Sequence, residues 1–391
     1  MKIKRLPEDF QVEELTEFAP GKGPFALYRL TKRSQGTPEV IEAILKRWNL
    51  PRKVVSYGGL KDRHAVTIQY VTVKNGPRRD LREKSFDLEY LGQAPRPFEP
   101  RDIAGNRFAI TIRDLTPEDA ARGVTTLQQV ARDGVPNYFD DQRFGSLGAS
   151  GEFIAKPWCL GDYERTLWLA LADPNPHDRP DEREQKRILR EKWGDWPACK
   201  QALARSNRRS IITYLVDHPT NFRGAVARLR VDLRSLWLAA FQSSLWNRVL
   251  ARWLRETCRP DQLQPVLLKL GTIPFYTVLD PEQRESLQKQ ELPLPSARIK
   301  LSPGPVADVI EQVLAEEGME LRELRVKYPR DSFFSKGNRA AVTVPRNPRH
   351  ATAADELHPG RTKLRLEFDL PRGAYATIVI KRLTELNGLS S

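Results

Sequence analysis

Residues 58–69, GGLKDRHAVTIQ, place several charged side chains after two glycines and directly before a predicted strand. These charged side chains are Lys61, Asp62, Arg63 and His64, and they lie in a tight connection whose backbone is constrained. A loop held at both ends by rigid elements is a common position for such groups. The same composition is also typical of a solvated turn between strands. The loop by itself therefore favours the solvated turn.

A second segment, VPNYFDDQRFG at residues 135–145, combines three aromatic rings with amide, carboxylate and guanidinium groups. Such rings stack on unstacked nucleobases, and the polar groups bind base edges, so the segment could contact RNA. Taken alone, the segment favours another interpretation, in which the rings are core residues that follow a helix. Two further segments, LPRGAYATIV at 370–379 and FQSSLWN at 241–247, are typical of a strand turning into a core element and of an amphipathic helix.

Potential metal ligands are dispersed along the chain. The three cysteines form no CxxC pair, and the five histidines form no HxxxH or HExxH pattern. These spacings predict neither a disulfide framework nor a metal site. A metal-dependent nuclease that uses Asp119, Asp140 and Asp141 is a competing interpretation, although these carboxylates have no recognisable ligand spacing.

Six segments occur in the order in which a known family has its motifs: Lys4 with LPEDFQVEE, GGLKDRHAVTIQ, VPNYFDDQRFG, FQSSLWN, NRAAVTVP and LPRGAYATIV. On these segments, which span residues 4 to 379, the chain resembles the TruD family of tRNA pseudouridine synthases. The most specific parts are the Lys-Asp loop followed by Ala and Thr-x-Gln, and the run Asn-Tyr-Phe-x-x-Gln-Arg-Phe-Gly.

The resemblance implies an RNA-modifying isomerase that converts a uridine in tRNA, at position 13 in this family, to pseudouridine without a cofactor. Asp62 matches the single catalytic carboxylate, acting as a nucleophile at the anomeric carbon or as a base at the neighbouring ribose carbon. Both roles require the ionised form. Lys4 matches the basic partner, and an ammonium beside Asp62 favours that form.

The resemblance also implies three supporting residues around a flipped base. Phe139 is expected beneath the base, Asn137 is expected to donate or accept hydrogen bonds around the pocket, and Tyr375 is expected to close it. Tyr375 stands where relatives often have Phe. Asp140 stands where they often have Gly, a difference that concerns the local backbone more than the chemistry, since Asp tolerates left-handed conformations.

The elements that must position these residues begin with a mixed α and β region over about the first 145 residues. Its β-rich or alternating runs predict strands at 10–15, 25–30, 66–73 and 108–112. The Thr-Pro-Glu signatures that start at Thr37 and Thr116 predict two helix beginnings. From about residue 150 the pattern becomes helical, above all at 181–193 and from Ser235.

The C-terminal part returns to β-type patterns. Residues 345–361, PRNPRHATAADELHPGR, predict an exposed loop. The following KLRLEFDL alternates apolar with charged residues and predicts a half-buried strand, and YATIVIKRL fits a strand or a short helix.

These patterns and the resemblance predict an α+β fold. The expected catalytic domain, of pseudouridine synthase type with a mixed or antiparallel sheet, comprises residues 1–160 and 340–391. A TruD-specific α-rich insertion domain is expected at 161–339. The length of 391 residues also favours two domains.

The net charge of +14 and the pI near 9.7 favour a polyanionic partner, and tRNA is the partner that the resemblance implies. No protein partner is implied. The chain has no run of about 18 apolar residues and no signal-peptide core, so we predict no membrane partner and a cytoplasmic location. The alternative function is a catalytically inactive RNA-binding protein of the same fold, against which Asp62 and Lys4 argue.

Overall fold

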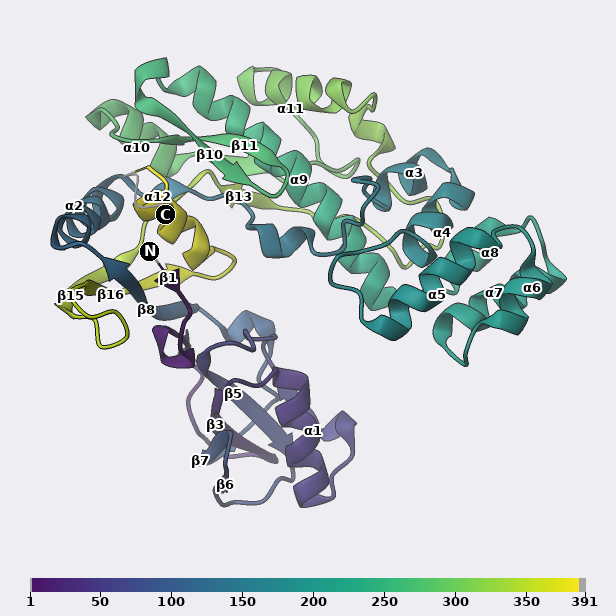
Figure 1. Cartoon of the computed structure of the whole chain (residues 1–391), viewed down its shortest axis with the longest axis horizontal. Coiled ribbons are helices and arrows are strands. Elements are labelled where there is room, and N and C mark those ends of the chain that lie inside the picture. Colours follow the sequence, from purple (N-terminus) through teal and green to yellow (C-terminus); the bar gives the residue numbers. More distant parts are fainter. Residues whose placement is uncertain (1, 387–391) are drawn as a thin grey trace. The chain divides into compact units, whose positions relative to one another are not determined.

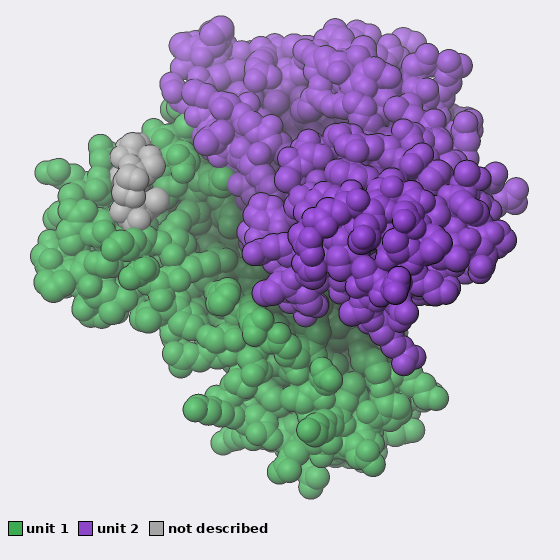
Figure 2. All heavy atoms as spheres, turned by 45° about the vertical axis from the view of Figure 1, so that its right-hand side comes forward, with its two compact units in different colours: residues 1–137, 277–280, 342–391 green, residues 138–276, 281–341 purple. Residues whose placement is uncertain are grey.

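A computed structural model of the chain describes residues 2–386 (Figure 1). They divide into two compact units (Figure 2): the first is Met1–Asn137, Thr277–Asp280 and Val342–Ser391, and the second is Tyr138–Tyr276 and Pro281–Ala341. Residues 138–160, predicted with the catalytic part, lie in the second unit. They do so because Tyr138 packs against Phe275 and donates a hydrogen bond to the carbonyl of Pro274 at 2.8 Å. The assignment of the units as catalytic and insertion domains stays a prediction.

The first unit is built on a ten-stranded sheet in the order β15-β16-β8-β2-β5-β3-β7-β6, with β1 paired to β8 and β4 paired to β5. β2 and β5 run parallel, and the neighbouring strands otherwise run antiparallel. The predicted mixed sheet of an α+β fold is therefore confirmed. The strands are β1 (Lys2–Ile3), β2 (Phe10–Leu15), β3 (Phe25–Arg33), β4 (Val55–Tyr57), β5 (Val66–Lys74), β6 (Leu81–Glu83), β7 (Phe86–Ala94), β8 (Gly105–Leu115), β15 (Arg346–Ala354) and β16 (Thr362–Pro371).

Three helices cover parts of this sheet. α1 (Thr37–Trp48) contributes Val40, Ile41 and Ile44 to a core shared with β3 and β5. α2 (Pro117–Asp133) packs on β8, β15 and β16 and contacts α12 (Ala376–Thr384). The helix start predicted at Thr116 is confirmed, because its hydroxyl accepts a hydrogen bond from the backbone N–H of Asp119 at 3.0 Å.

One predicted loop is partly a strand. Residues 346–354, within the loop predicted at 345–361, form β15 and pair with β16. All nine side chains are exposed, so the strand has no buried face and leaves no alternating apolar pattern in the sequence. Asn347, with φ of 52°, and Pro348 lie where the pairing register shifts between Arg346 and Arg349, and an edge strand tolerates proline at such a bulge.

The second unit is rich in helices. Its longest element is α9 (Val231–Thr257), which buries Phe241, Leu245 and Trp246 and packs on α3, α11 and β11. It also contains the hairpin β10–β11 and the antiparallel strand pair β12–β13, whose strands are far apart in the sequence. The other elements are α3 (Ala155–Leu160), α4 (Tyr163–Leu171), α5 (Pro180–Glu191), α6 (Trp196–Ala202), α7 (Asn207–Asp217), α8 (Phe222–Ala227), α10 (Pro281–Lys289), α11 (Pro305–Glu316), β10 (Leu263–Leu268), β11 (Gly271–Tyr276), β12 (Glu291–Pro293) and β13 (Asn338–Ala340).

Across residues 2–386, none of the helices combines the length and the apolar composition that crossing a bilayer requires.

Candidate active site

The loop with Asp62 connects β4 to β5 and is held by a side chain of α1 and a side chain of β5. The Thr37 hydroxyl at the start of α1 accepts a hydrogen bond from the backbone N–H of Lys61 at 3.1 Å and donates one to Gln69 at 2.9 Å. Gln69 in turn donates from its amide to the carbonyl of Gly59 at 3.3 Å. The Thr37 side chain thus binds the loop and does not cap the helix. Gln69, the glutamine of the Thr-x-Gln motif, also binds the loop.

The first glycine of the loop is required by close packing. A Cβ atom at Gly58 would lie 2.9 Å from Cγ1 of Ile103 and 3.1 Å from Cε1 of Phe98. A larger residue would require the Ile103 side chain or the loop to shift. Gly58 therefore allows the loop to pack closely against Ile103 and Phe98 where it leaves β4.

Asp62 and Lys4, which the sequence predicts to cooperate, are in direct contact. Nζ of Lys4 donates a hydrogen bond to Oδ2 of Asp62 at 3.0 Å. The two side chains are 28% and 34% exposed, so the ion pair is reachable from solvent. An exposed carboxylate beside an ammonium on a fixed loop can attack a carbon atom or accept a proton.

Lys4 is held in place by the turn that follows it. Its backbone has φ of 57°, in the left-handed region that a lysine adopts at an energetic cost, and its ammonium lies 3.9 Å from the centre of the Phe10 ring. The carboxylate of Asp9 accepts a hydrogen bond from the backbone N–H of Leu6 at 2.9 Å, which closes the turn. Strain at Lys4 therefore persists because the surrounding contacts fix it.

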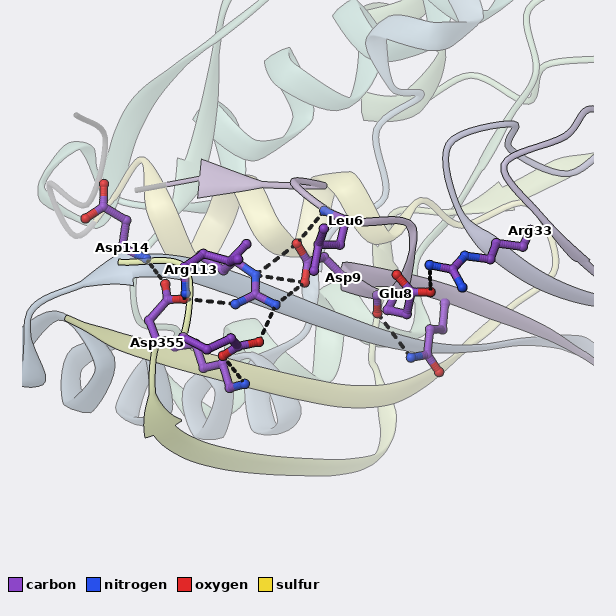
Figure 3. A network of polar contacts seen from close by, with 11 residues as sticks. Leu6, Glu8, Asp9, Arg33, Arg113, Asp114 and Asp355 are labelled. Carbon is purple, nitrogen blue, oxygen red and sulfur yellow. Dashed lines mark hydrogen bonds and ion pairs between the residues drawn. The ribbon is translucent and has the colours of Figure 1, made fainter. Parts of the chain in front are cut away.

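Asp9 belongs to a buried polar network that extends from the N-terminal turn to the segment after β15 (Figure 3). Arg113 of β8 donates from Nε to Asp9 at 2.9 Å and from Nη1 to Asp355 at 2.9 Å, and it also pairs with Glu356. Asp355 accepts a further hydrogen bond from the backbone N–H of Asp114 at 2.9 Å. The network ties the turn that carries Lys4 to the centre of the sheet.

The neighbouring Lys61 is turned away from the Asp62 carboxylate. Its ammonium lies 3.0 Å from Oε1 of Glu14 and donates to Oδ1 of Asn106 at 2.7 Å. Burial raises the pKa of Glu14, and the Lys61 ammonium and the backbone N–H of Tyr70 partly offset that effect. Lys61 therefore anchors the loop to β2 and β8.

Asn137 and Tyr375 also lie in the first unit. Asn137 follows β9 (Val135–Pro136), which pairs with β14 (Val342–Thr343), the strand inside the NRAAVTVP motif. Tyr375 immediately precedes α12, and α12 contacts β9. The two residues therefore belong to one region of the unit.

Phe139 lies in the second unit, where α9 holds it. The side-chain amide of Asn247 accepts from the backbone N–H of Phe139 at 2.8 Å and donates to its carbonyl at 2.9 Å. The ring meets Trp246 edge to face with centroids 5.6 Å apart, and the Arg339 guanidinium lies 4.1 Å from the ring centre. The segments FQSSLWN and NRAAVTVP thus both serve to position Phe139.

The carboxylates of the nuclease interpretation have local structural roles instead. Asp119 pairs with Thr116 and Arg122 at the start of α2, in the first unit. In the second unit, Asp140 caps a short 3-10 helix at Gln142, and Asp141 accepts from the backbone N–H of Lys269 at 2.8 Å. These contacts account for the acidic residues of the aromatic motif without a metal.

Several residues that hold the site were not identified from the sequence, namely Asp9, Glu14, Lys32, Thr37, Gln69, Arg113 and Asn247. A signal existed for two of them. Glu14 and Lys32 occupy inward positions in β2 and β3, where the alternation calls for an apolar residue. A charged residue at such a position requires a buried partner, and here partners of both residues lie in the loop that carries Asp62.

Comparison with known proteins agrees with the sequence motifs. The family model of tRNA pseudouridine synthase D (TruD) matches residues 1–383. A relative from Methanocaldococcus jannaschii, described as a probable tRNA pseudouridine synthase D 2, is 32% identical over 389 residues, covering 98% of this chain and 91% of the relative. The tRNA pseudouridine synthase D of Aquifex aeolicus is 27% identical over 395 residues, with 98% of each chain covered.

A solved structure has the same fold. The crystal structure of a protein from Methanosarcina mazei, described as a tRNA pseudouridine synthase D (TruD), superimposes with a TM-score of 0.74 and 24% identity. The match covers 100% of this chain and 94% of the other.

Proposed function

The chain belongs to the TruD family, and on this premise we propose that it is an isomerase that converts a uridine in tRNA to pseudouridine. In this reaction the bond between uracil N1 and the anomeric carbon breaks, and a bond from C5 to the same carbon forms. C5 loses a proton and N1 gains one, so no oxidant or reductant is consumed. The chemistry needs one well-placed carboxylate and no cofactor.

The observation that carries the proposal is the contact of Lys4 with Asp62 at 3.0 Å on a loop tethered by Thr37 and Gln69. As a nucleophile, Asp62 bonds to the anomeric carbon, uracil leaves and turns, and C5 displaces the carboxylate. As a base, Asp62 takes the proton of the neighbouring ribose carbon and later returns it. In both cases Lys4 orients the carboxylate through its hydrogen bond.

The uracil must leave the stack to reach Asp62, which makes base flipping part of the proposal. Phe139 would stack on the flipped base, Asn137 would form hydrogen bonds around it, and Tyr375 would close the pocket. The guanidinium of Arg339 already lies on the Phe139 ring at 4.1 Å, and such a contact resembles the stack that a base would make. An incoming uracil must therefore share the ring with Arg339 or displace it.

The charge of +14 supports tRNA as the substrate, because contacts to phosphate provide affinity that depends on salt. Position 13 of tRNA, the target implied by the family resemblance, is the first position to examine. A cytoplasmic location and the division into a catalytic domain and an α-rich insertion domain belong to the same proposal.

The test is pseudouridine mapping of tRNA that has been incubated with the purified protein and no added cofactor. We expect one uridine to be converted and Asp62→Asn to abolish conversion while tRNA affinity is retained. Asp87→Asn, which changes an exposed aspartate of β7, is the matched control and should remain active. Tight tRNA binding without conversion by the unmodified chain would favour the inactive RNA-binding alternative.

Two additional experiments distinguish the isomerase from a metal-dependent enzyme and the nucleophile role of Asp62 from the base role. Loss of activity in a chelator, restored by magnesium, would count against a metal-independent isomerase. With uridine deuterated at the ribose carbon next to the anomeric carbon, a primary isotope effect on the single-turnover rate would assign the base role to Asp62, and its absence would favour the nucleophile.

A further inference from the structure

Lys32 is a lysine without solvent contact in the middle of the first unit. It lies in β3 at a position where alternate residues face the interior, and its exposed fraction is 0%. Its register partners are Thr67 on β5 and Phe86 on β7, and neither carries a charge. Burying an ammonium group costs free energy unless it is paired, so the contacts of Lys32 indicate its role.

The ammonium of Lys32 is directed at the backbone of the catalytic loop. Nζ donates to the carbonyl of Asp62 at 2.7 Å and to the carbonyl of Gln35 at 2.7 Å, and it lies 3.5 Å from the carbonyl of Lys61. An ammonium has three N–H groups, which matches this set of three acceptors. The contact therefore fixes the main chain of Asp62, whereas Lys4 contacts its side chain.

We infer that Lys32 is a positioning residue for catalysis, whose buried ammonium holds the backbone of Asp62 so that its carboxylate faces the substrate. This inference rests on the proposed function. Lys32 itself does not contact the Asp62 carboxylate in any hydrogen bond described above, so it acts through the loop. Misplacement of a catalytic group by about 1 Å can lower a rate about 100-fold, which sets the scale of the effect.

The energetics support a functional origin for this lysine. Burial lowers the pKa of Lys32 to about 8; Asp62 and Glu39 oppose this shift, and Lys61 adds to it. Glu39, on α1, also pairs with Arg63 of the loop at 3.3 Å. Because the folded pKa lies below the ordinary value of 10.5, keeping Lys32 protonated lowers the free energy of unfolding at neutral pH, and this penalty is lost as pH rises from about 8 to 10.5.

The same pKa predicts an alkaline limit for the reaction. A neutral amine has two N–H groups and a lone pair, and the lone pair would face a carbonyl. The loop should therefore loosen as pH rises through about 8. Arginine keeps its charge over this range, so Lys32→Arg, if it folds, should lack this limit.

The experiment compares Lys32→Met with Lys186→Met by single-turnover pseudouridine formation, tRNA binding and thermal melting. Lys186 is the matched control because it is also a buried lysine, 8% exposed, but pairs with Asp178 at 2.8 Å in the second unit. We expect Lys32→Met to lose about 10–100-fold in rate with unchanged tRNA affinity while it remains folded at the assay temperature. Lys186→Met should keep its rate.

Each result decides the question. A folded Lys32→Met with the wild-type rate overturns the inference, and so does a rate loss that is matched by a loss of tRNA affinity. If Lys32→Met does not fold, the wild-type profile decides, and a rate that stays constant from pH 7 to about 9.5 overturns the inference. Absence of pseudouridine from the wild-type reaction would instead refute the proposed function.

Discussion

Nζ of Lys4 and Oδ2 of Asp62 lie 3.0 Å apart although the residues are 58 positions apart in the chain. The pair is partly exposed, so its interaction is weaker than that of a buried pair. We predict that Lys4→Met lowers the single-turnover rate about tenfold, which corresponds to about 1.4 kcal/mol. Lys2→Met is the control, because Lys2 pairs with Asp114 instead, at 4.0 Å. Equal rates for the two variants would exclude Lys4 from the reaction.

Asn247 binds both backbone groups of Phe139, and its removal leaves a buried donor and acceptor unpaired. Asn247→Ala should lower the free energy of unfolding by about 1–3 kcal/mol and also reduce the rate. Both quantities can be measured, by urea denaturation and by single-turnover assay. Ser244→Ala, on the same helix, removes a hydroxyl that donates to the carbonyl of Phe241 one turn earlier, so we expect a smaller change. A similar loss in both variants would mean that α9 tolerates neither truncation.

Phe139 can be tested with two substitutions that separate stacking from packing. Phe139→Leu keeps an apolar side chain against Trp246 but has no aromatic face. We predict that it weakens the step that holds the flipped uracil by about 1–3 kcal/mol, while the melting temperature changes less than in Phe139→Ala. Unchanged kinetics in both variants would transfer the role to Tyr375, since Tyr138 is buried against Phe275.

Because of the Arg113 network, the free energy of unfolding should depend on pH in the acidic range. Hydrogen bonds from Arg113 and Lys363 lower the pKa of Glu356 to about 2. Because the folded pKa is depressed, Glu356 stabilises the fold above its ordinary pKa, and this contribution is lost as pH falls towards about 2. Glu356→Gln should therefore lower the urea midpoint at pH 7, and the difference from wild type should shrink steadily below pH 4.5.

A control is needed because the substitution also changes the net charge. Glu42→Gln removes an exposed carboxylate from α1, in the same unit. If this variant shifted the urea midpoint as much as Glu356→Gln does, the effect would come from net charge and not from Arg113.

Much of the fold could be predicted because the local sequence patterns indicate where strands and helices begin and end. β2 begins and ends at the predicted residues, and α2 begins after the predicted Thr116. β15 could not be predicted, because its strand character comes from pairing with β16 and not from its own side chains. Tertiary pairing overrides local preference in such edge strands.

The candidate site was predictable in part for the same reason. The contact of Asp62 with Lys4 was expected from the family resemblance and is found. The inward position of Lys32 in β3 indicated a buried partner but not which one, because two of its acceptors are backbone carbonyls of a loop more than twenty residues later, and backbone groups leave no trace in side-chain patterns. The sequence also places Phe139 beside Asn137 without indicating that the two lie in different units.

The pairing of β8 with both β2 and β16 has a consequence for synthesis on the ribosome. β2 and β8 are translated within the first 115 residues, but β16 begins only at Thr362, after the whole second unit. At ordinary elongation rates this separation lasts on the order of ten seconds or more, during which domains fold as units. Until β16 has been translated, one edge of β8 in the nascent first unit therefore has unpaired backbone groups that can pair with other strands. We expect the nascent unit to depend on chaperones during this time.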